Sequence, residues 1–188
     1  MKIIETPIPG LLILKPRVFS DDRGYFFESY NSKKFEDSGI STIFIQDNES
    51  KSTYGVIRGL HYQLEPYSQC KLVRVIQGKV YDVAVDCRKG SPTFGQSFGT
   101  ELSAENKLQF YIPKGFAHGF SVLSETAIFS YKCDSLYHPS ADRGIFYNDP
   151  ALGINWGIDA SEAIVSGKDK VLPLFADAEM NFKFDAND

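Results

Sequence analysis

The chain has 188 residues, of which 43% are hydrophobic, and a formal net charge of −4. This length and composition favour one globular domain spanning residues 1–188. The acidic balance argues against binding to nucleic acid or to an anionic membrane, because such partners require a dense basic surface. Any anionic ligand is therefore expected to bind at a local cluster of cations.

The three cysteines, Cys70, Cys87 and Cys133, are far apart and form no CxxC motif. They predict neither a disulfide framework nor a zinc knuckle, and they favour a reducing cytoplasm. The first residues do not resemble a signal peptide, and no apolar run approaches the ~18 residues that a membrane-spanning helix needs. We therefore expect a soluble cytoplasmic protein with no membrane partner.

Segments rich in Val, Ile, Phe, Tyr and Thr alternate with turn residues, which is typical of an all-β protein. A short helix is expected at 32–38, because Gly39 can end it in the left-handed conformation, and a single helical turn near 103–106. Residues 71–86 predict a hairpin around Gln77-Gly78-Lys79. The other expected strands cover residues 11–16, 24–30, 42–48, 97–101, 109–112, 116–122 and 127–131. This number of strands suits a jelly roll or a similar double sheet.

The last third of the chain, from about residue 137, is irregular because prolines and glycines interrupt any long element. We expect this tail to wrap the sheet. In the second arm of the expected 71–86 hairpin, alternation places Asp82 on one face with Val80 and Ala84, so that the Asp82 carboxylate would face a barrel interior.

Residues 55–63, GVIRGLHYQ, place Arg58 and His61 in one strand-like run. An imidazole transfers protons near neutral pH and a guanidinium holds an anion, so the pair predicts proton chemistry on a negatively charged small molecule. Strict alternation places Arg58 and His61 on opposite faces, although a bulge at Gly59 would re-aim one neighbour. Taken alone, His61 is better explained as a hydrogen-bonded structural residue, so a catalytic role depends on the surrounding motifs.

Further short motifs follow along the chain, at residues 46–48 (QDN), 90–95 (GSPTFG), 102–106 (LSAEN), 113–120 (PKGFAHGF) and 148–150 (NDP). Together with residues 55–63 they closely resemble the dTDP-4-dehydrorhamnose 3,5-epimerase family, from about Arg17 to Pro173. The resemblance implies a cupin-type jelly roll with short helices, usually a homodimer. It also implies a reaction that inverts C3 and C5 of dTDP-4-dehydro-6-deoxy-D-glucose to give dTDP-4-dehydro-L-rhamnose, a step toward activated L-rhamnose.

Both inverted carbons lie beside the C4 ketone, so removal of their hydrogen gives an enolate that the ketone itself stabilises. Such a reaction needs a base, an oxyanion stabiliser and an acid on the opposite face. It requires no nicotinamide, pyridoxal or metal, and the sequence has no GxGxxG fingerprint. We therefore expect no cofactor.

The resemblance assigns four catalytic residues. It implies that His61 is the general base, that Asp169 orients its ring, that Tyr131 is the proton donor and that Lys71 stabilises the enolate oxygen. Reasoning from the residues alone leaves Asp82 and Asp86 open as partners of His61, since either lies on a strand face that can turn inward.

The substrate-binding residues that the resemblance implies are Arg23, Phe26, Glu28, Gln46, Asp47, Asn48, Arg58, His118, Tyr137, Asp142 and Lys168. Arginine forks suit diphosphate oxygens and an aromatic face suits thymine. Part of this cleft is completed by the neighbouring subunit in the family. Two positions depart from the family pattern, which commonly has Glu at Asp142 and Trp-Pro at Trp156-Gly157.

Three alternatives stay open. A metal-dependent cupin enzyme would use His61 and His118, with His138 in a Pro-bounded loop as the only third histidine. A sugar-nucleotide binding module would have the same fold without turnover. A closer alternative is an enzyme that epimerises one carbon only, or a ketoisomerase of a related dTDP-sugar.

Overall fold

The computed structural model describes residues 1–185, which form two facing β-sheets and a projecting hairpin. The strands of the first sheet are β1 (Lys2–Glu5), β2 (Leu12–Lys15), β5 (Gln46–Thr53), β7 (Lys71–Gln77), β10 (Gln109–Ile112) and β12 (Thr126–Cys133). The strands of the second are β6 (Val56–Gln63), β8 (Lys79–Asp86), β9 (Ser97–Ser103), β11 (Phe116–Val122), β13 (Asp142–Gly144) and β14 (Ile164–Val165). The hairpin consists of β3 (Val18–Asp21) and β4 (Gly24–Phe27).

Helices are few and short. The one α-helix is α1 (Ser32–Glu36), and the 3₁₀ turns within the described residues are η1 (Pro139–Ala141), η2 (Ala160–Glu162), η3 (Asp169–Val171) and η4 (Phe175–Asp177). Asn31 caps α1 by accepting a hydrogen bond from the Lys34 amide, and Gly39 follows with a φ of +86°. The expected helix is therefore confirmed, while the helical turn expected near 103–106 is absent: Ser103 ends a strand and residues 104–106 form a turn.

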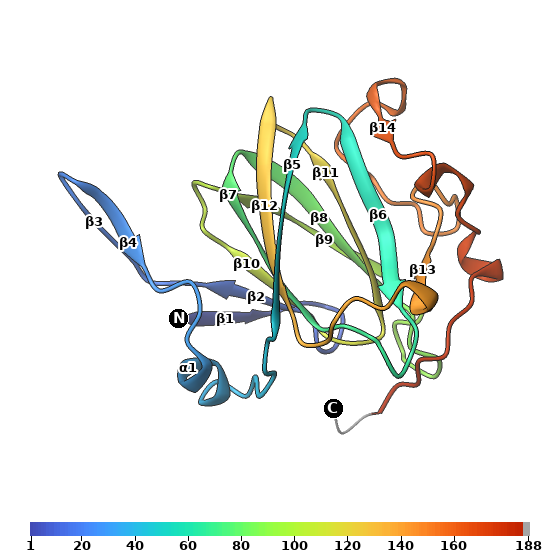
Figure 1. The fold of residues 1–188 in the computed structure, drawn as a ribbon, viewed down its shortest axis with the longest axis horizontal. Helices are drawn as coiled ribbons and strands as arrows, with labels where there is room; N and C mark the ends of the chain where they lie inside the picture. The colour runs from blue at the N-terminus through green and yellow to red at the C-terminus, as the bar shows by residue number, and fades with distance from the viewer. Residues whose placement is uncertain (186–188) are drawn as a thin grey trace.

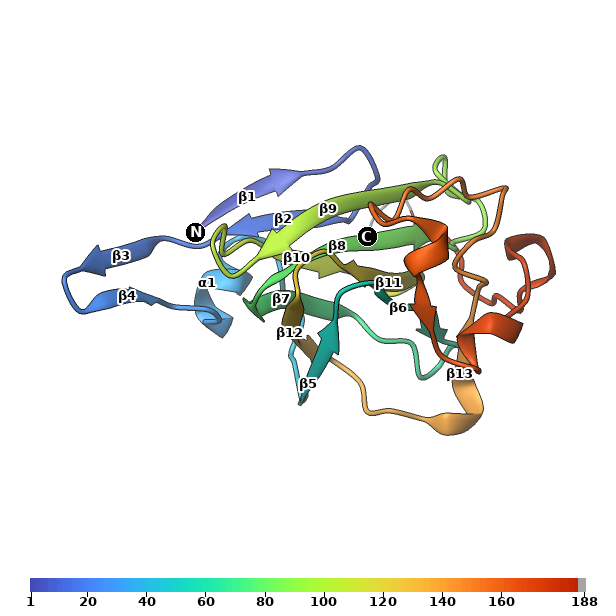
Figure 2. The ribbon, with the colours of Figure 1, turned by 90° about the horizontal axis from the view of Figure 1, so that it is seen from above.

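The strand order is β1-β2-β10-β7-β12-β5 in the first sheet and β13-β6-β11-β8-β9 in the second, where β14 also pairs with β6 in parallel. The other pairings between these strands are antiparallel, and the two sheets face each other across the body of the molecule (Figures 1 and 2). The all-β double sheet predicted from the sequence is confirmed.

The predicted hairpin at 71–86 is wrong, because its two arms lie in different sheets. β7 pairs with β10 and β12, whereas β8 pairs with β9 and β11. Gly78 turns the chain between them with a φ of +77°, and a Cβ there would lie 2.0 Å from the Thr126 carbonyl oxygen. A tight turn alone does not distinguish a hairpin from a crossing between sheets.

The strand expected at 42–48 begins only at Gln46 and continues to Thr53. Its sequence, QDNESKST, is polar throughout and has little strand propensity, so the sequence did not show its extent. Pairing with β12 along its whole length holds it in place at the edge of the first sheet.

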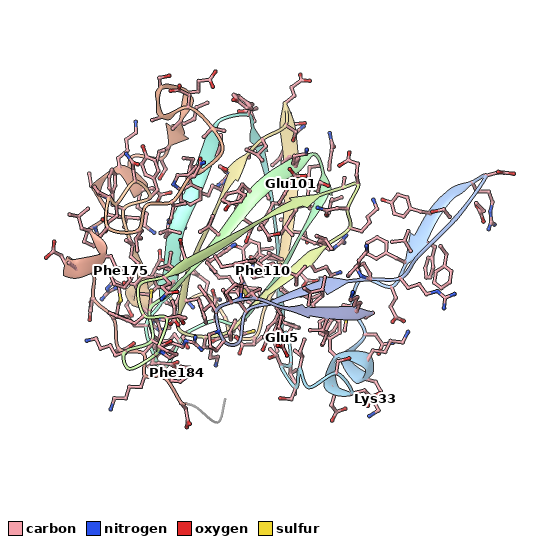
Figure 3. The ribbon with its side chains drawn as sticks, turned by 180° about the vertical axis from the view of Figure 1, so that it is seen from behind. Glu5, Lys33, Glu101, Phe110, Phe175 and Phe184 are labelled. Atoms are coloured by element: carbon pink, nitrogen blue, oxygen red, sulfur yellow. The ribbon has the colours of Figure 1, made fainter. Side chains whose placement is uncertain are left out.

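The main core lies between the sheets and contains Phe110, Phe120 and Phe129 with aliphatic residues of β7 and β8. Figure 3 shows Phe110 among the strands and Phe175 on the C-terminal segment. A second apolar cluster joins the outer face of β6 and β8 to that segment, where Ile145 and Trp156 are buried. The tail therefore wraps the second sheet, as predicted.

The hairpin β3–β4 extends away from the two sheets (Figures 1 and 2). Its large side chains remain accessible, with Phe19 51%, Tyr25 58% and Phe26 69% exposed. Exposed aromatic residues on a projecting arm are typical of a surface that contacts another molecule.

Candidate active site

A pocket of about 630 Å³ lies between the open ends of the two sheets. Strands β5, β7 and β12 line it from one side, β6 and β11 from the other, and residues 164–169 of the C-terminal segment close one wall. Its volume is within the range of sites for small molecules. The predicted site residues that line it are Asn48, Arg58, His61, Lys71, His118, Tyr131, Lys168 and Asp169.

A bulge in β6 brings Arg58 and His61 to the same pocket. Arg58 pairs with Phe120 and His61 with His118, so that Gly59 and Leu60 together lie opposite the single residue between them on β11. This extra residue reverses the alternation. The expectation that Arg58 and His61 face opposite sides is therefore wrong, and the bulge anticipated at Gly59 is the reason.

Close approach of two backbones explains why glycine occupies this bulge. Gly59 has a φ of +127°, and a Cβ there would lie 2.5 Å from the Gly119 Cα. A Cβ at Gly119 would lie 2.7 Å from the Arg58 carbonyl oxygen. The two glycines therefore let β6 and β11 meet beside His61 and His118.

His61 forms a hydrogen-bonded pair with Asp169. Its Nε2 lies 2.8 Å from Asp169 Oδ1, while the Gly59 amide donates to Oδ2 at 3.4 Å. Burial opposes ionisation of Asp169, but the hydrogen bond and charge of His61, together with hydrogen bonds from Gly59 and Ser166, outweigh burial and hold the carboxyl pKa below its ordinary value. An ionised Asp169 accepts the proton of Nε2, which leaves Nδ1 as the basic nitrogen of a neutral His61.

Asp169 is 3% exposed, whereas the side chain of His61 is 33% exposed. The Asp169 amide donates to Ser166 Oγ at 3.1 Å, which fixes the start of η3. A buried anchor with an accessible imidazole suits a base that must reach a ligand. The sequence alternatives are excluded, because Asp86 binds Arg88 and Asp82 binds His118.

Lys71 and Tyr131 line the same pocket from the first sheet. Burial lowers the pKa of Lys71, and the nearby Cys133 and Asp82 oppose this shift. Burial also raises the pKa of the Tyr131 phenol, with a smaller opposing effect of Arg58. Tyr131 therefore keeps its proton at neutral pH and is available as a donor.

His118, one of the expected binding residues, is buried beside the pocket. It is 8% exposed, and its Nε2 lies 3.0 and 3.1 Å from the two carboxylate oxygens of Asp82, which is 0% exposed. Burial raises the pKa of Asp82 and lowers that of His118. Asp82 faces the interior, as its alternation predicted.

A chain of hydrogen bonds joins further predicted residues beside the pocket. Gln46 donates to Asn48 at 2.9 Å and accepts from the Tyr137 amide at 3.2 Å. The Tyr137 hydroxyl lies 3.1 Å from Asp142, which also binds the Lys168 ammonium. Asp142 therefore links two segments, residues 137–142 and 164–169, at the edge of the pocket.

Four predicted binding residues lie elsewhere in this chain. Arg23 pairs with Asp21 at the tip of the projecting hairpin, and Phe26 is exposed on it. Glu28 pairs with Lys34 of α1. Asp47 pairs with Lys132 at 2.8 Å, because alternation along β5 turns it away from Asn48.

His138 lies outside the pocket and stacks on Tyr67 with ring centroids 3.7 Å apart. Within residues 1–185, no group of three or more His, Cys, Asp or Glu side chains is placed to hold a metal ion. In the same part of the chain, no helix is long and apolar enough to cross a membrane.

Sequence reasoning missed how Asp82 is used and the support that Gly59, Gly119 and Ser166 give to the two histidines. The alternation of β8 was the available signal for Asp82, which the residues alone left open as a partner of His61. A bulge at Gly59 was anticipated, but Gly119 and Ser166 carried no signal, because close backbone approach and a serine accepting from an amide are visible only in three dimensions.

Comparison with known proteins places this fold and pocket in one family. The sequence model described as dTDP-4-dehydrorhamnose 3,5-epimerase matches residues 5–177. The chain belongs to the dTDP-4-dehydrorhamnose 3,5-epimerase family. A family relative from Shigella flexneri, the dTDP-4-dehydrorhamnose 3,5-epimerase, is 53% identical over 180 residues, which cover 95% of this chain and 98% of the relative.

Solved structures of the family agree. That of dTDP-6-deoxy-D-glucose-3,5-epimerase from Legionella pneumophila, in complex with dTDP-4-keto-L-rhamnose, has a TM-score of 0.94 at 48% identity and covers 98% of this chain and 99% of that one. A 3'-monoepimerase from Streptomyces bikiniensis, in complex with dTDP-quinovose, has a TM-score of 0.85 at 32% identity, covering 91% and 86%. The family therefore includes enzymes that differ in how many carbons they invert.

Proposed function

We propose that this protein is a dTDP-4-dehydrorhamnose 3,5-epimerase, which inverts C3 and C5 of dTDP-4-dehydro-6-deoxy-D-glucose to give dTDP-4-dehydro-L-rhamnose in dTDP-L-rhamnose biosynthesis. About half of the residues are identical to family enzymes of that name over nearly the whole chain. The main structural support for this activity is that the His61–Asp169 pair, Lys71 and Tyr131 line one pocket. The expected compartment is the cytoplasm.

The base in this proposal is His61. Nδ1 of the neutral imidazole removes the hydrogen from the carbon beside the C4 ketone, and the imidazolium that results is stabilised by ionised Asp169 at 2.8 Å. A general base of this kind contributes about 10²- to 10⁴-fold in rate. The partial exposure of His61 allows its ring to reach the sugar.

Lys71 and Tyr131 complete the reaction. The Lys71 ammonium stabilises the negative charge that develops on the C4 oxygen, in a pocket where burial strengthens electrostatic interactions. Tyr131, from the sheet opposite His61, then returns a proton to the other face of the carbon. Removal on one face and return on the other inverts the centre.

The decisive experiment is incubation with dTDP-4-dehydro-6-deoxy-D-glucose in deuterated water, followed by NMR. Deuterium at both C3 and C5 is expected, because each inversion exchanges carbon-bound hydrogen with solvent. Label at C3 alone would favour the activity named for the Streptomyces bikiniensis relative instead. No label at either carbon would contradict epimerisation altogether.

Tyr131→Phe separates abstraction from return of the proton. The phenylalanine keeps the ring in β12 but cannot donate, so we expect exchange at the reacting carbons to continue while inverted product falls by about 10²-fold or more. Tyr111→Phe is a matched control, because the Tyr111 hydroxyl binds Thr42 away from this pocket. Equal loss of exchange and inversion in Tyr131→Phe would argue against a donor role.

We further propose that the enzyme is a homodimer in which the β3–β4 hairpin of one subunit completes the pocket of the other. This accounts for Arg23 and Phe26, which are exposed on that hairpin, far from other binding residues of their own chain. Phe26→Ala is expected to raise KM about tenfold or more with little change in kcat, since stacking on a base contributes about 1–3 kcal/mol. A monomer in sedimentation measurements, or an unchanged KM, would contradict the shared cleft.

A further inference from the structure

A second His–Asp pair adjoins the pocket through His118, and the proposed reaction leaves this pair without a role. Asp82 on β8 is fully buried, and both of its carboxylate oxygens face His118 Nε2. A carboxylate that loses all contact with water is costly unless other groups compensate its charge. Its hydrogen bond to a neutral imidazole satisfies the oxygens but leaves the charge.

Lys71 is the opposite case, a cation in a largely buried position. Within residues 1–185, its ammonium forms no hydrogen bond or ion pair, although it lines the pocket and is largely buried. A lysine in such a place loses its proton readily. To stabilise an enolate, however, Lys71 must remain charged.

The charged and titratable groups that act on Lys71 lie on β8, β12 and β13. Negative charge comes from Asp82 on β8 and, at the pocket edge, from Asp142 on β13. Cys133 on β12 lies opposite Lys71 in the strand register, and burial raises its pKa to about 11, so the thiol is neutral near pH 7. The imidazoles of His61 and His118 also line this pocket, and burial lowers the pKa of His118.

We propose that Asp82, oriented by His118, is the buried counter-ion that keeps the Lys71 ammonium charged and thereby available to the enolate oxygen. Asp142 already binds both Lys168 and Tyr137 at the edge, so its charge is largely compensated there. Among the described residues Asp82 forms no ion pair with a lysine or an arginine, and its only side-chain partner is His118. Asp82 shares the strand face of Val80 and Ala84, which points into the space between the sheets, and His118 lines the same pocket as Lys71. Asp82 is thus a positioning residue that acts through Lys71, and this inference rests on the proposed function.

The two buried groups support each other's ionised forms. Lys71 opposes the rise in the pKa of Asp82, and Asp82 opposes the fall in the pKa of Lys71. His118 donates one N–H to Asp82 and so holds the carboxylate in place, without contributing a charge while it stays neutral. The Asp82–His118 pair then carries one negative charge, opposite the one positive charge of Lys71.

Asp82→Asn tests this directly, because the amide keeps the shape and a hydrogen bond to His118 but removes the charge. The pH profile of kcat is expected to lose activity on its alkaline side at a pH lower by about one unit or more, the size of shift that one nearby opposite charge produces. The Lys71 ammonium, followed by NMR in lysine-labelled protein without substrate and assigned with Lys71→Arg, should show the same downward shift.

Asp86→Asn is the matched control. Asp86 is also a fully buried carboxylate on β8, but it pairs with Arg88 and lies outside the pocket. This variant is expected to lose stability without moving the alkaline limb or the Lys71 titration. An equal shift in both variants would reduce the effect to general destabilisation and overturn the inference, as would an unshifted Lys71 in folded Asp82→Asn.

The wild-type enzyme provides a test that needs no folded variant at Asp82. The Lys71 NMR midpoint is expected to lie above neutral pH and to coincide with the alkaline limb of kcat; a Lys71 that is uncharged at pH 7 would overturn the inference. His118→Gln, which retains an N–H for Asp82, should leave the Lys71 midpoint in place. Absence of epimerisation by the wild type would refute the proposed function, whereas the Lys71 titration would still decide the role of Asp82.

Discussion

The histidines of two His–Asp pairs line the same pocket from neighbouring strands, with His61 and His118 directly opposite each other in the register of β6 and β11. In one pair the imidazole is one-third exposed and the carboxylate is supported by the Gly59 amide. In the other pair both groups are buried, and the carboxylate has only the imidazole as a hydrogen-bond partner among the described residues.

The difference in burial changes the chemistry of identical groups. The pKa of Asp169 falls despite its burial because two donors and an accessible imidazole favour its charged form, so His61 can gain and release a proton. The pKa of Asp82 rises and that of His118 falls because burial dominates. An exposed pair suits proton transfer with a ligand, whereas a buried pair suits a fixed charge.

The largest expected effect separates the two histidines. His61→Asn removes the base but keeps a polar side chain beside Asp169, and should reduce deuterium exchange at the substrate by about 10²- to 10⁴-fold. His118→Gln should reduce it far less, since no proton passes through His118. NMR exchange rates measured side by side check this, with His138→Asn as the control outside the pocket. Equal losses at His61 and His118 would break the comparison.

A medium effect is expected where the two strands meet. Gly59→Ala places a Cβ against the Gly119 backbone at a positive φ, and should lower the free energy of unfolding by roughly 2–4 kcal/mol, measured by denaturant titration. Gly90→Ala is the matched control, because its φ is also positive, +87°, but a Cβ there meets no atom within 4 Å. If both variants lost equal stability, backbone conformation alone, and not the contact between β6 and β11, would be responsible.

The smallest effect concerns stability in acid, where protonation of the two carboxylates changes the free energy of unfolding in opposite directions. A lowered folded-state pKa means that Asp169 stabilises the protein above its ordinary value of 3.8 and loses this contribution as the pH falls through the lowered pKa. The raised pKa of Asp82 gives a contribution that is present at low pH and lost as the pH rises through the folded-state value. Differences of about 2 kcal/mol or less are expected.

Unfolding free energies measured between pH 6 and 3 check the two signs. Asp169→Asn should flatten the loss of stability toward acid, whereas Asp82→Asn should steepen it. Parallel curves for the two variants would show that the two carboxylates are electrostatically equivalent, contrary to the comparison.

Strand segments with a strong local pattern were predictable, and those defined by pairing were not. Residues 109–112 and 116–122 form strands with the predicted bounds, because aromatic and β-branched residues recur in them. The polar strand β5 and the crossing at Gly78 depended on what lay opposite them. Local propensity contains no information about the partner strand.

The same distinction holds for the site. His61 and Arg58 stand out in the sequence as groups suited to proton transfer and anion binding, but alternation placed them on opposite faces until the bulge at Gly59 was known. The residues alone left three carboxylates open as the partner of His61. The pocket assigned Asp169 to His61 and Asp82 to His118, with Asp86 bound to Arg88.

By itself, the sequence determined the all-β class, the family and the set of groups available for an enolate reaction, because these follow from side-chain chemistry and from the order of motifs along the chain. Only the tertiary structure decided which groups meet and which are ionised. His61 and Asp169 are 108 residues apart and touch only because the C-terminal segment packs on β6. The charge of each carboxylate depends on its burial and its neighbours, and both are properties of the folded chain.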